Sequence, residues 1–453
     1  MNPDLQDGFG HYLHYDVRLR EEARARGIRF TSLGNKNAAA DLAPDFLVPT
    51  FSNNSWTAGR FRKPGVATAF ARELKGALET GHASESDRRI YYLYLGSVRH
   101  AWAVLTLAAA NPDALRSFHV NLFYSADDFT ASGRLKSEVR DEYELVLGAV
   151  AAFGGRLGVT VSVETQRLAD WIRGATSHEV PVLPFFGVTQ LTEEHAERVR
   201  ARISRSPREG RVVYFPGNLH PAKGYDLFLD LVAKHRTSFV GGGVRFVMRN
   251  VLAGKEEGAI RRRLRRLRHS VEVIDGVLAD DAYIELFVRA DVIVLPYRRS
   301  AFAARTSAAL ADAMTLGIPV VAVRGTWLGD WVDALGCGAT FEENSLPDFR
   351  DALRRVLDNH SQFVEGARCA RLRWLAENTP GRLIDFLMDC GERCATRESD
   401  ALDPGLAGLL EAAMNLEDGR TVLEAGAGPR RAPYPRAPQW VRWLREQVGR
   451  SRG

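Results

Sequence analysis

The stretch VIVLPYRRSAFAARTSAALADAMTLGIPVVAV, residues 292–323, decides the fold. Its first apolar run predicts a buried strand, after which a loop follows. Small and apolar residues from about Thr306 to Leu316 predict a helix, which Gly317 ends, and IPVVAV predicts a second buried strand. Two buried strands joined by a helix are typical of a parallel α/β sheet.

The same alternation of strands and helices continues toward the start of the chain. The apolar runs RVVYFPG, VRFVMRNV and VEVIDGV predict three more strands. Four earlier runs, at 28–33, 88–95, 118–124 and 159–164, also predict strands with helices between them. A proline-bearing link and a charged helix over 180–210 separate the two series. The sequence therefore predicts two α/β domains.

Length and composition are those of a globular protein with more than one core. The chain has 453 residues, of which 45% are hydrophobic and 26% charged. No run approaches the roughly 20 apolar residues that span a bilayer, and the start, MNPDLQDGFGHYLHYD, lacks the pattern of a signal peptide. The four cysteines are scattered, which predicts reduced thiols. We therefore expect a cytoplasmic protein.

The net charge of +5 and the pI near 9.0 come from arginines spread along the chain. They are densest between Arg261 and Arg268, where Leu264 and Leu267 predict a solvated helix with one apolar seam. The alternative is attraction of an anionic partner, namely a phosphate-rich donor, acidic lipid head groups or RNA, although we expect no nucleic-acid partner. The final segment, WVRWLREQVGRSRG, predicts a packing segment or tail, with peripheral contact at the inner membrane face as the alternative.

The first candidate for chemistry is FPGNLHPAKGYDLFLDLV, residues 215–232. A strand ends at Pro216 and Gly217, and Lys223 stands where an amphipathic helix opens after a loop. A lysine beside the free N–H groups of a helix N-terminus suits a diphosphate. The structural alternative is a lysine in an exposed turn.

The second candidate is the helix that begins near Thr306. Ser307 and the alanines after it let a ligand approach the N-terminal N–H groups closely, and Arg305 stands just before them. Asp312 follows one to two turns later, where a carboxylate is suited to accept hydrogen bonds from ribose hydroxyls. Because the carboxyl ends of parallel strands meet at one sheet edge, we expect Lys223 and Arg305 at one ligand site.

Residues from about 210 to 390 resemble the C-terminal domain of family 4 (group 1) glycosyltransferases of the GT-B fold. GNLHPAKG is similar to the family's G-R-x(4)-K-G loop, and VIDGVLADDAYIELFVRADVIVLPY to its nucleotide-base strand and helix. DAMTLGIPVVA is similar to the family's E-A-M-x-x-G-x-P-V-V-A segment. The N-terminal half is similar more loosely, through GFGHYLHYDVRLREEARARG and through ETQRLADWI before VPVLPFF.

The resemblance implies an α/β, GT-B organisation with two facing Rossmann-like domains, an inter-domain cleft and a C-terminal helical extension. It implies an acceptor domain over 1–190 and a nucleotide-sugar donor domain over 205–375. It further implies a helix over 376–395 that closes back toward the N-terminal domain, and a partly irregular extension over 396–453.

The resemblance also implies roles for residues of the donor domain. Lys223 neutralises the diphosphate of the donor, Asp312 holds the ribose, and Val277, after Gly276, lies beside the base. The predicted donor-binding residues are Gly8, Gly10, Gly217, Asn218, Gly276, Val277, Thr306, Ser307 and Asp312, and the predicted catalytic residues are Lys223, His11 and Arg305.

In the N-terminal half, the resemblance assigns Gly8 and Gly10 to the donor phosphates and points His11 toward the sugar or the acceptor. A capping or packed histidine is the alternative for His11. The DGFGH loop begins only seven residues into the chain. Either the first domain lacks the strand that precedes such a loop, or the start lies upstream. Candidates for the acceptor side, each equally an ordinary surface or core residue, are Tyr12, Asn53, Asn54, Trp56 and Asp128.

Three departures from the family pattern bear on catalysis. Asn218 stands in place of the family's loop arginine, and Ala304 in place of the first glutamate of its E-x7-E pair. These changes remove a phosphate cation and a contact to the donor sugar, for which Arg305 or Arg298 is a candidate replacement. Asp312 replaces the second glutamate and preserves its charge with a shorter reach.

These features predict a glycosyltransferase of the hexosyltransferase type that uses a nucleotide-sugar and serves polysaccharide biosynthesis. The acceptor is expected to be a glycan, a lipid-linked molecule or a small molecule. The resemblance implies retention of anomeric configuration, and we expect no metal and no cofactor, because cationic side chains and helix N-termini stabilise the departing diphosphate. The alternatives are a catalytically impaired GT-B pseudo-enzyme that binds nucleotide or glycan, and a GT-B epimerase or phosphorylase.

Overall fold

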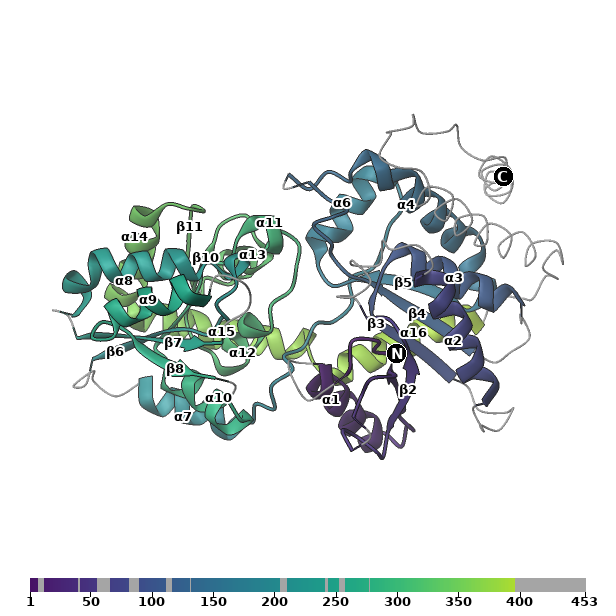
Figure 1. The fold of residues 1–453 in the computed structure, drawn as a ribbon, viewed down its shortest axis with the longest axis horizontal. Helices are drawn as coiled ribbons and strands as arrows, with labels where there is room; N and C mark the ends of the chain where they lie inside the picture. The colour runs from purple at the N-terminus through teal and green to yellow at the C-terminus, as the bar shows by residue number, and fades with distance from the viewer. Residues whose placement is uncertain are drawn as a thin grey trace. The chain divides into compact units, whose positions relative to one another are not determined.

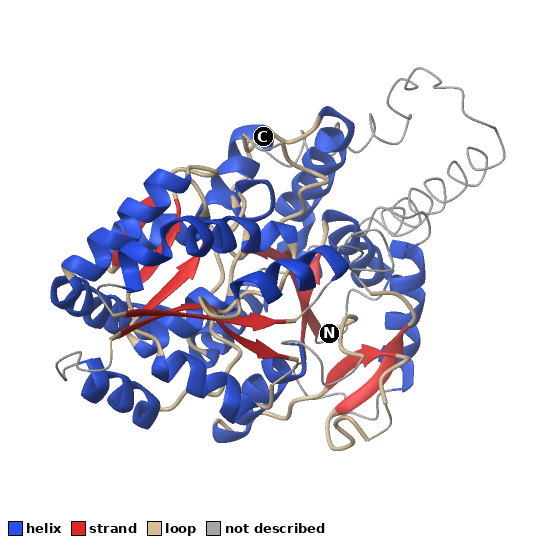
Figure 2. Cartoon of the chain, turned by 60° about the vertical axis from the view of Figure 1, so that its left-hand side comes forward, coloured by secondary structure: helices blue, strands red, loops and turns tan. Residues whose placement is uncertain are grey.

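The computed structural model describes residues 1–6, 12–39, 41–54, 66–80, 89–110, 116–130, 132–203, 210–240, 243–251, 257–276 and 278–395 (Figure 1). The chain divides into two compact units. The first unit combines Met1–Leu183 with the chain from Pro380 onward, and the second unit is the continuous segment Pro184–Thr379. In Figure 2 most of the strands (red) are flanked by helices (blue).

The second unit contains one parallel sheet, in the strand order β11-β10-β9-β6-β7-β8. The chain enters the middle of this sheet with β6, continues outward through β7 and β8, and returns to the other side of β6 with β9. Val213 of β6 lies opposite Val292 of β9. The winding direction therefore reverses between β6 and β9. The strands are β6 (Arg211–Phe215), β7 (Val244–Asn250), β8 (Glu272–Asp275), β9 (Val292–Leu295), β10 (Val320–Val323) and β11 (Gly338–Phe341).

Helices and turns connect these strands. All four residues of β9 are completely buried, which explains why the sequence shows a continuous apolar run there instead of alternation. The helical elements of the second unit are α7 (Glu193–Ile203), the 3-10 turn η2 (Pro221–Lys223), α8 (Tyr225–Val240), α9 (Glu257–Leu267), α10 (Asp280–Arg289), α11 (Arg299–Phe302), α12 (Ala308–Leu316), α13 (Trp327–Leu335), α14 (Leu346–Asp358) and α15 (His360–Glu377).

The first unit has a parallel sheet β3-β4-β5 and a parallel pair β1-β2. The strands are β1 (Ser32–Asn35), β2 (Leu47–Phe51), β3 (Arg89–Gly96), β4 (Arg116–Leu122) and β5 (Val159–Val163). The helical elements are α1 (Tyr12–Ala25), α2 (Val66–Thr80), α3 (Val98–Ala110), α4 (Ser137–Ala149), the π-helical turn η1 (Val150–Gly154), α5 (Gly155–Leu157), α6 (Gln166–Thr176) and α16 (Pro380–Ala395).

The first residues of the chain lie between these two groups of strands. The amide of Tyr94 in β3 donates to the carbonyl oxygen of Met1 at 3.2 Å. On the other side, the amide of Asn2 donates to Leu33 of β1 at 2.8 Å. The first residues thus lie where a strand before residues 7–11 would be expected, between β1 and β3.

Helix α16 belongs to the first unit although it comes last among the described elements. In Figure 1 it lies beside β3 and β4, and Arg26 of α1 pairs with Asp385 at 2.5 Å. The ring of Phe386 stands edge-on to buried His119 of β4, with ring centroids 5.4 Å apart. Burial lowers the pKa of His119 to about 3, so this histidine is neutral at physiological pH.

Two strands of the structure had no counterpart among the predicted ones. β2 contains Pro49, which cannot donate to a ladder, and in this structure β2 hydrogen-bonds only to β1 among the described strands. β11 is short and begins with Gly338. Both are edge strands of their described sheets, where a weak strand signal is tolerated. Within the described ranges, no helix has both the length and the apolar character needed to cross a bilayer.

Gly338 is expected to be essential for the edge of the second sheet. A Cβ added there would lie 1.7 Å from the carbonyl oxygen of Val320, so Gly338→Ala must push β11 away from β10. We expect a loss of about 2–3 kcal/mol in the stability of the second unit. Thermal unfolding followed by circular dichroism measures the shift. Gly258→Ala, at an exposed position of α9, is the matched control, and equal unfolding midpoints for the two variants would contradict the close approach of Gly338 to Val320.

Candidate active site

Two loops meet at the carboxyl end of the second sheet, where the winding direction reverses. One follows β6 and ends in the turn η2, and the other follows β9 and leads through α11 to α12. The backbone N–H of Arg298 donates to the carbonyl oxygen of Ala222 at 2.9 Å, which joins the two loops. Open α/β sheets bind their ligands at such a place.

The turn that carries Lys223 is fixed by its neighbours. Gly224 has a φ of +67°, and a Cβ on it would lie 1.9 Å from the carbonyl oxygen of Pro296. Only glycine satisfies both conditions. His220 caps the turn, because its Nδ1 accepts a hydrogen bond from the amide of Ala222 at 3.1 Å. The backbone around Lys223 is therefore held directly against the end of β9.

The Lys223 ammonium lies against two aromatic rings of the neighbouring loop. Its Nζ is 4.0 Å from the ring centroid of Tyr297 and 4.8 Å from that of Phe302. These rings attract the cation through their faces and at the same time exclude water from it. Lys223 is half-buried, so the alternative of a lysine in an exposed turn does not describe it.

Arg305 is the second cation at this place. Its Cζ lies 5.6 Å from the ring centroid of Phe302, the same ring that contacts Lys223. Burial, together with the positive charge of Arg305, lowers the pKa of Lys223 to about 7. Two like charges in a partly desolvated place disfavour each other unless an anion compensates them. The arrangement therefore favours a bound anion.

The helix α12 begins at Ala308, two residues later than the sequence predicted. Thr306 precedes the helix, and Ser307 is its N-cap, with extended backbone and a hydroxyl that accepts from the amide of Leu310 at 3.4 Å. Ser307 is buried, and this capping contact occupies its hydroxyl. A ligand at this end of α12 would therefore contact the backbone N–H groups of its first turn. Thr306 lies half-buried just before them.

Asp312 is more deeply buried than we would expect of a residue that binds the ribose of a donor. Its carboxylate is 1% exposed, and Oδ2 accepts from the hydroxyl of Thr189 at 2.9 Å and from that of Tyr283 at 3.1 Å. A Cβ on Gly187 would lie 3.1 Å from Oδ1, so the segment that enters the second unit passes directly over this carboxylate. The contact of Asp312 with a ribose remains a prediction.

Three further residues gather here that the sequence did not single out. Arg249, at the carboxyl end of β7, has its Cζ 5.0 Å from the ring centroid of Tyr283. Within the described part of the chain, Arg249 Nε and the buried hydroxyl of Tyr214 have no hydrogen-bond partner. Leaving a buried polar group unpaired costs about 1–3 kcal/mol, so these groups favour a polar ligand or water. The sequence could have indicated Arg249 as a site residue, because it lies near the carboxyl end of a predicted strand.

The remaining predicted residues occupy different settings. Gly217 lies against the ring of Phe215, and Asn218 is exposed in the loop after β6. Gly276 follows β8, and β7 lies between β8 and β6 in the sheet. The φ of Gly276 is +82°. Arg298 pairs with Asp226 at 2.5 Å, so of the two arginine candidates Arg305 is the one that faces Lys223. The predicted residues Gly8, Gly10, His11 and Val277, and the candidate Trp56, lie outside the described residues.

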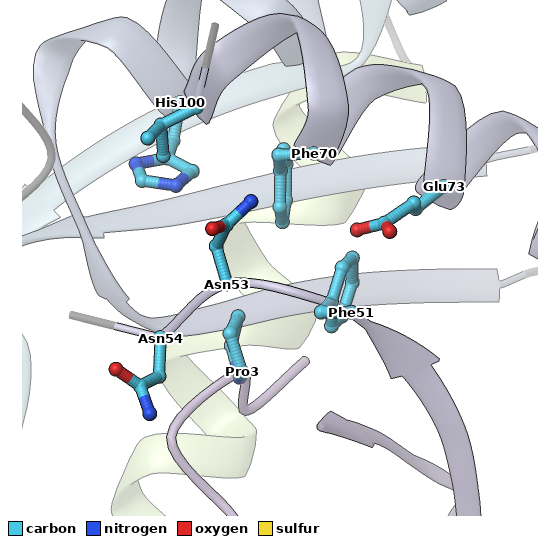
Figure 3. A pocket seen from close by; sticks show the side chains of 8 residues that line it. Pro3, Phe51, Asn53, Asn54, Phe70, Glu73 and His100 are labelled. Atoms are coloured by element: carbon cyan, nitrogen blue, oxygen red, sulfur yellow. The ribbon is translucent and has the colours of Figure 1, made fainter. Parts of the chain in front are cut away.

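Candidates for the acceptor side lie in the first unit. Asn53 and Asn54 line a pocket together with Phe51, Glu73 and His100, among others (Figure 3). In the figure, the amide of Asn53 and the carboxylate of Glu73 point toward the space around the ring of Phe70. Asp128 instead accepts a hydrogen bond from the hydroxyl of Tyr143 at 3.0 Å. A role in acceptor binding stays a prediction for all of them.

The arrangement of the second unit has a counterpart among known protein families. Residues 210–359 match the model of the family described as Glycosyl transferases group 1. In this segment the chain is similar to group 1 glycosyltransferases. The match contains Lys223, Arg305 and Asp312, and the resemblance to group 1 glycosyltransferases predicted from the sequence is confirmed.

An individual curated relative extends the comparison. A D-inositol 3-phosphate glycosyltransferase of Acidothermus cellulolyticus is 27% identical over 251 residues, which are 53% of this chain and 54% of that protein. The chain thus spans about half the length of this curated relative.

Solved structures are similar over most of the chain. A glycosyltransferase from Rickettsia africae has a TM-score of 0.61 at 10% identity, covering 86% of this chain and 96% of its own. Sucrose-phosphate synthase from Thermosynechococcus elongatus has a TM-score of 0.60 at 14% identity, and the match covers 87% of this chain and 97% of that one. Anabaena HepE, solved with UDP and glucose, has a TM-score of 0.56 at 14% identity, and the match covers 87% of this chain and 99% of that one. At such low identity the likeness shows the fold alone, and the predicted GT-B fold is confirmed.

The pKa of Lys223 is expected to respond to its cationic neighbour and to an anion. Competitive acetylation followed by mass spectrometry, across roughly pH 6 to 10, should give a pKa of about 7. Arg305→Gln should raise this pKa because one positive charge is removed, and inorganic pyrophosphate should raise it because an anion favours the ammonium form. By the same linkage, pyrophosphate affinity should fall as the pH rises above about 7.

Exposed Lys234 on α8 is the internal reference for reactivity in this experiment. If the pKa of Lys223 stayed the same in Arg305→Gln and in the presence of pyrophosphate, the two side chains would not share an anion site.

Proposed function

We propose that the chain transfers a sugar from a nucleoside-diphosphate sugar to an acceptor hydroxyl. The observation that carries this proposal is the pair of cations, Lys223 and Arg305, on two loops that meet where the second sheet reverses its winding. A diphosphate is the anion whose charge and position fit two cations beside a helix N-terminus. The group 1 glycosyltransferase match over the same residues supports the reaction class.

In the proposed reaction, the bond between the anomeric carbon and the diphosphate oxygen breaks as the acceptor oxygen bonds to that carbon. The nucleoside diphosphate leaves with additional negative charge, and the proton of the acceptor hydroxyl passes to the departing phosphate oxygen. Lys223 in its ammonium form, Arg305 and the N-terminal backbone of α12 stabilise the departing charge. This role requires no metal ion, and we propose a metal-independent transfer with retention of anomeric configuration.

The relatives support particular donors and acceptors as a starting point. HepE was solved with UDP and glucose, which supports a UDP-sugar donor. The curated relative is a D-inositol 3-phosphate glycosyltransferase, which supports a small hydroxylated acceptor beside the glycan and lipid-linked classes. We propose a UDP-sugar as the first donor to examine.

Incubation of the protein with UDP-, GDP- and ADP-sugars should release nucleoside diphosphate from one class of donor, most rapidly with the correct acceptor present. The release should persist in EDTA, because side chains neutralise the leaving group. Binding of a nucleotide-sugar without any release would instead favour the pseudo-enzyme, and loss of release in EDTA would contradict metal independence.

Lys223→Ala is expected to lower the rate of nucleoside diphosphate release at least about tenfold, or about 1.4 kcal/mol of barrier. The reason is the lost stabilisation of the departing diphosphate. Lys234→Ala, on the exposed side of α8, is the matched control and should retain the rate. A Lys223→Ala protein as active as this control would remove Lys223 from the mechanism.

Arg249→Gln is expected to weaken donor binding, because Arg249 presents a half-buried guanidinium among polar groups at the end of β7. We expect the KM for the donor to rise about fivefold or more, which corresponds to roughly 1 kcal/mol. Arg245→Gln, at an exposed position of the same strand, is the matched control. Equal KM values for the two variants would confine Arg249 to a structural role.

A further inference from the structure

Two aromatic rings of the loop after β9 form one apolar wall beside the Lys223 ammonium. The ring centroids of Tyr297 and Phe302 lie 4.7 Å apart, with 48° between the ring planes. Both side chains are buried. Lys223 Nζ lies over the ring of Tyr297 at 4.0 Å from its centroid, and at 4.8 Å from that of Phe302. Tyr297 therefore makes the closer contact with the ammonium.

The loop that carries these rings is anchored at several points. The amide of Phe302 donates to the carbonyl oxygen of Arg298 at 2.9 Å, within the helical turn α11. The side chain of Arg298 pairs with Asp226 of α8 at 2.5 Å. Arg299 Nε donates to the carbonyl oxygen of Arg324, just after β10, at 2.8 Å. The two rings therefore have a fixed place against which a flexible lysine side chain can be positioned.

The charged groups around Lys223 oppose its ammonium form. Burial lowers the pKa of Lys223 to about 7, and the positive charge of Arg305 acts in the same direction. Arg298 and Asp226 are paired with each other, and His220 of the same turn is exposed to solvent. Among the described residues, no acidic side chain forms an ion pair with Lys223. The contact that favours the ammonium is therefore the aromatic one.

We propose that Tyr297 is a positioning residue, whose ring face keeps Lys223 in its ammonium form and in place for the diphosphate of the donor. The negative face of an aromatic ring attracts a cation, and most strongly where water is excluded. The ring thus opposes the effects of burial and of Arg305. Its hydroxyl, which interacts with Ser307, is not part of this role. The proposal rests on the proposed sugar transfer, because it explains how Lys223 is made ready for the departing diphosphate.

Tyr297→Leu tests the role of the ring, because it removes the ring face and leaves an apolar side chain in the same place. The pKa of Lys223, measured by competitive acetylation and mass spectrometry, should fall below its value in the unmodified protein. A lower pKa weakens anion binding only where Lys223 begins to lose its proton. Relative to the unmodified protein at the same pH, the Kd for inorganic pyrophosphate should rise about tenfold at pH 8 and about twofold or less at pH 6.

Three further variants serve as controls, and unfolding midpoints show whether each is folded. Tyr297→Phe keeps the ring face and should recover the affinity that Tyr297→Leu loses at pH 8. Phe302→Leu should lower the pKa of Lys223 to a smaller degree, because this ring is farther from the ammonium. Phe239→Leu removes another buried ring of the second unit, which contacts Arg354, and should leave pyrophosphate binding unchanged.

A purely structural role for Tyr297 predicts a different pattern. Tyr297→Leu would then weaken pyrophosphate binding equally at pH 6 and pH 8, or would raise the pKa of Lys223 by admitting water, and either result would overturn the proposal. A Tyr297→Phe protein as weak as Tyr297→Leu would overturn it in favour of the hydroxyl. If Tyr297→Leu does not fold, the direction of the shift in Phe302→Leu decides.

The turnover of nucleotide-sugars by the unmodified protein separates this test from the proposed function. A lower pKa of Lys223 in Tyr297→Leu, without any turnover by the unmodified protein, would leave the positioning role in place and remove the sugar transfer. Turnover by the unmodified protein, with the same pKa of Lys223 in both proteins, would support the sugar transfer and remove Tyr297 from it.

Discussion

The second unit depends on the adjacency of β6 and β9. Because these two strands are neighbours while the chain leaves β6 in one direction and returns in the other, their following loops open at one place. The contact of Gly224 with Pro296 and the hydrogen bond between Arg298 and Ala222 then hold the loops together. Lys223 and the aromatic rings against it take their positions from this constraint, and the proposed anion site depends on them.

Much of this arrangement could be predicted from the sequence because it rests on local signals. Continuous apolar runs mark the central strands, which are buried on both faces, and Gly317 does end the helix α12 with a left-handed backbone. Lys223 and Arg305 follow two such strands, so their meeting at one sheet edge is a consequence of parallel topology. These expectations need no knowledge of side-chain packing.

Other features depend on contacts between distant residues and escaped prediction. The N-cap at Ser307 and the short helix α11 shift the start of α12, and nothing local distinguishes Ser307 from Thr306 before it. The hydrogen bonds of Asp312 come from Thr189 and Tyr283, which lie 123 and 29 residues away in the chain. β2 contains a proline that only an edge position tolerates, and edge positions are a property of the assembled sheet.

The place of α16 has a consequence for how the protein is made. The second unit is one continuous segment, whereas the first unit is completed only by α16, whose Phe386 and Asp385 contact His119 and Arg26. During synthesis on a ribosome, residues 184–379 emerge before α16 does. Domains tend to fold as they emerge, so the unit that starts first is completed last, when α16 has emerged and can pack against β3 and β4.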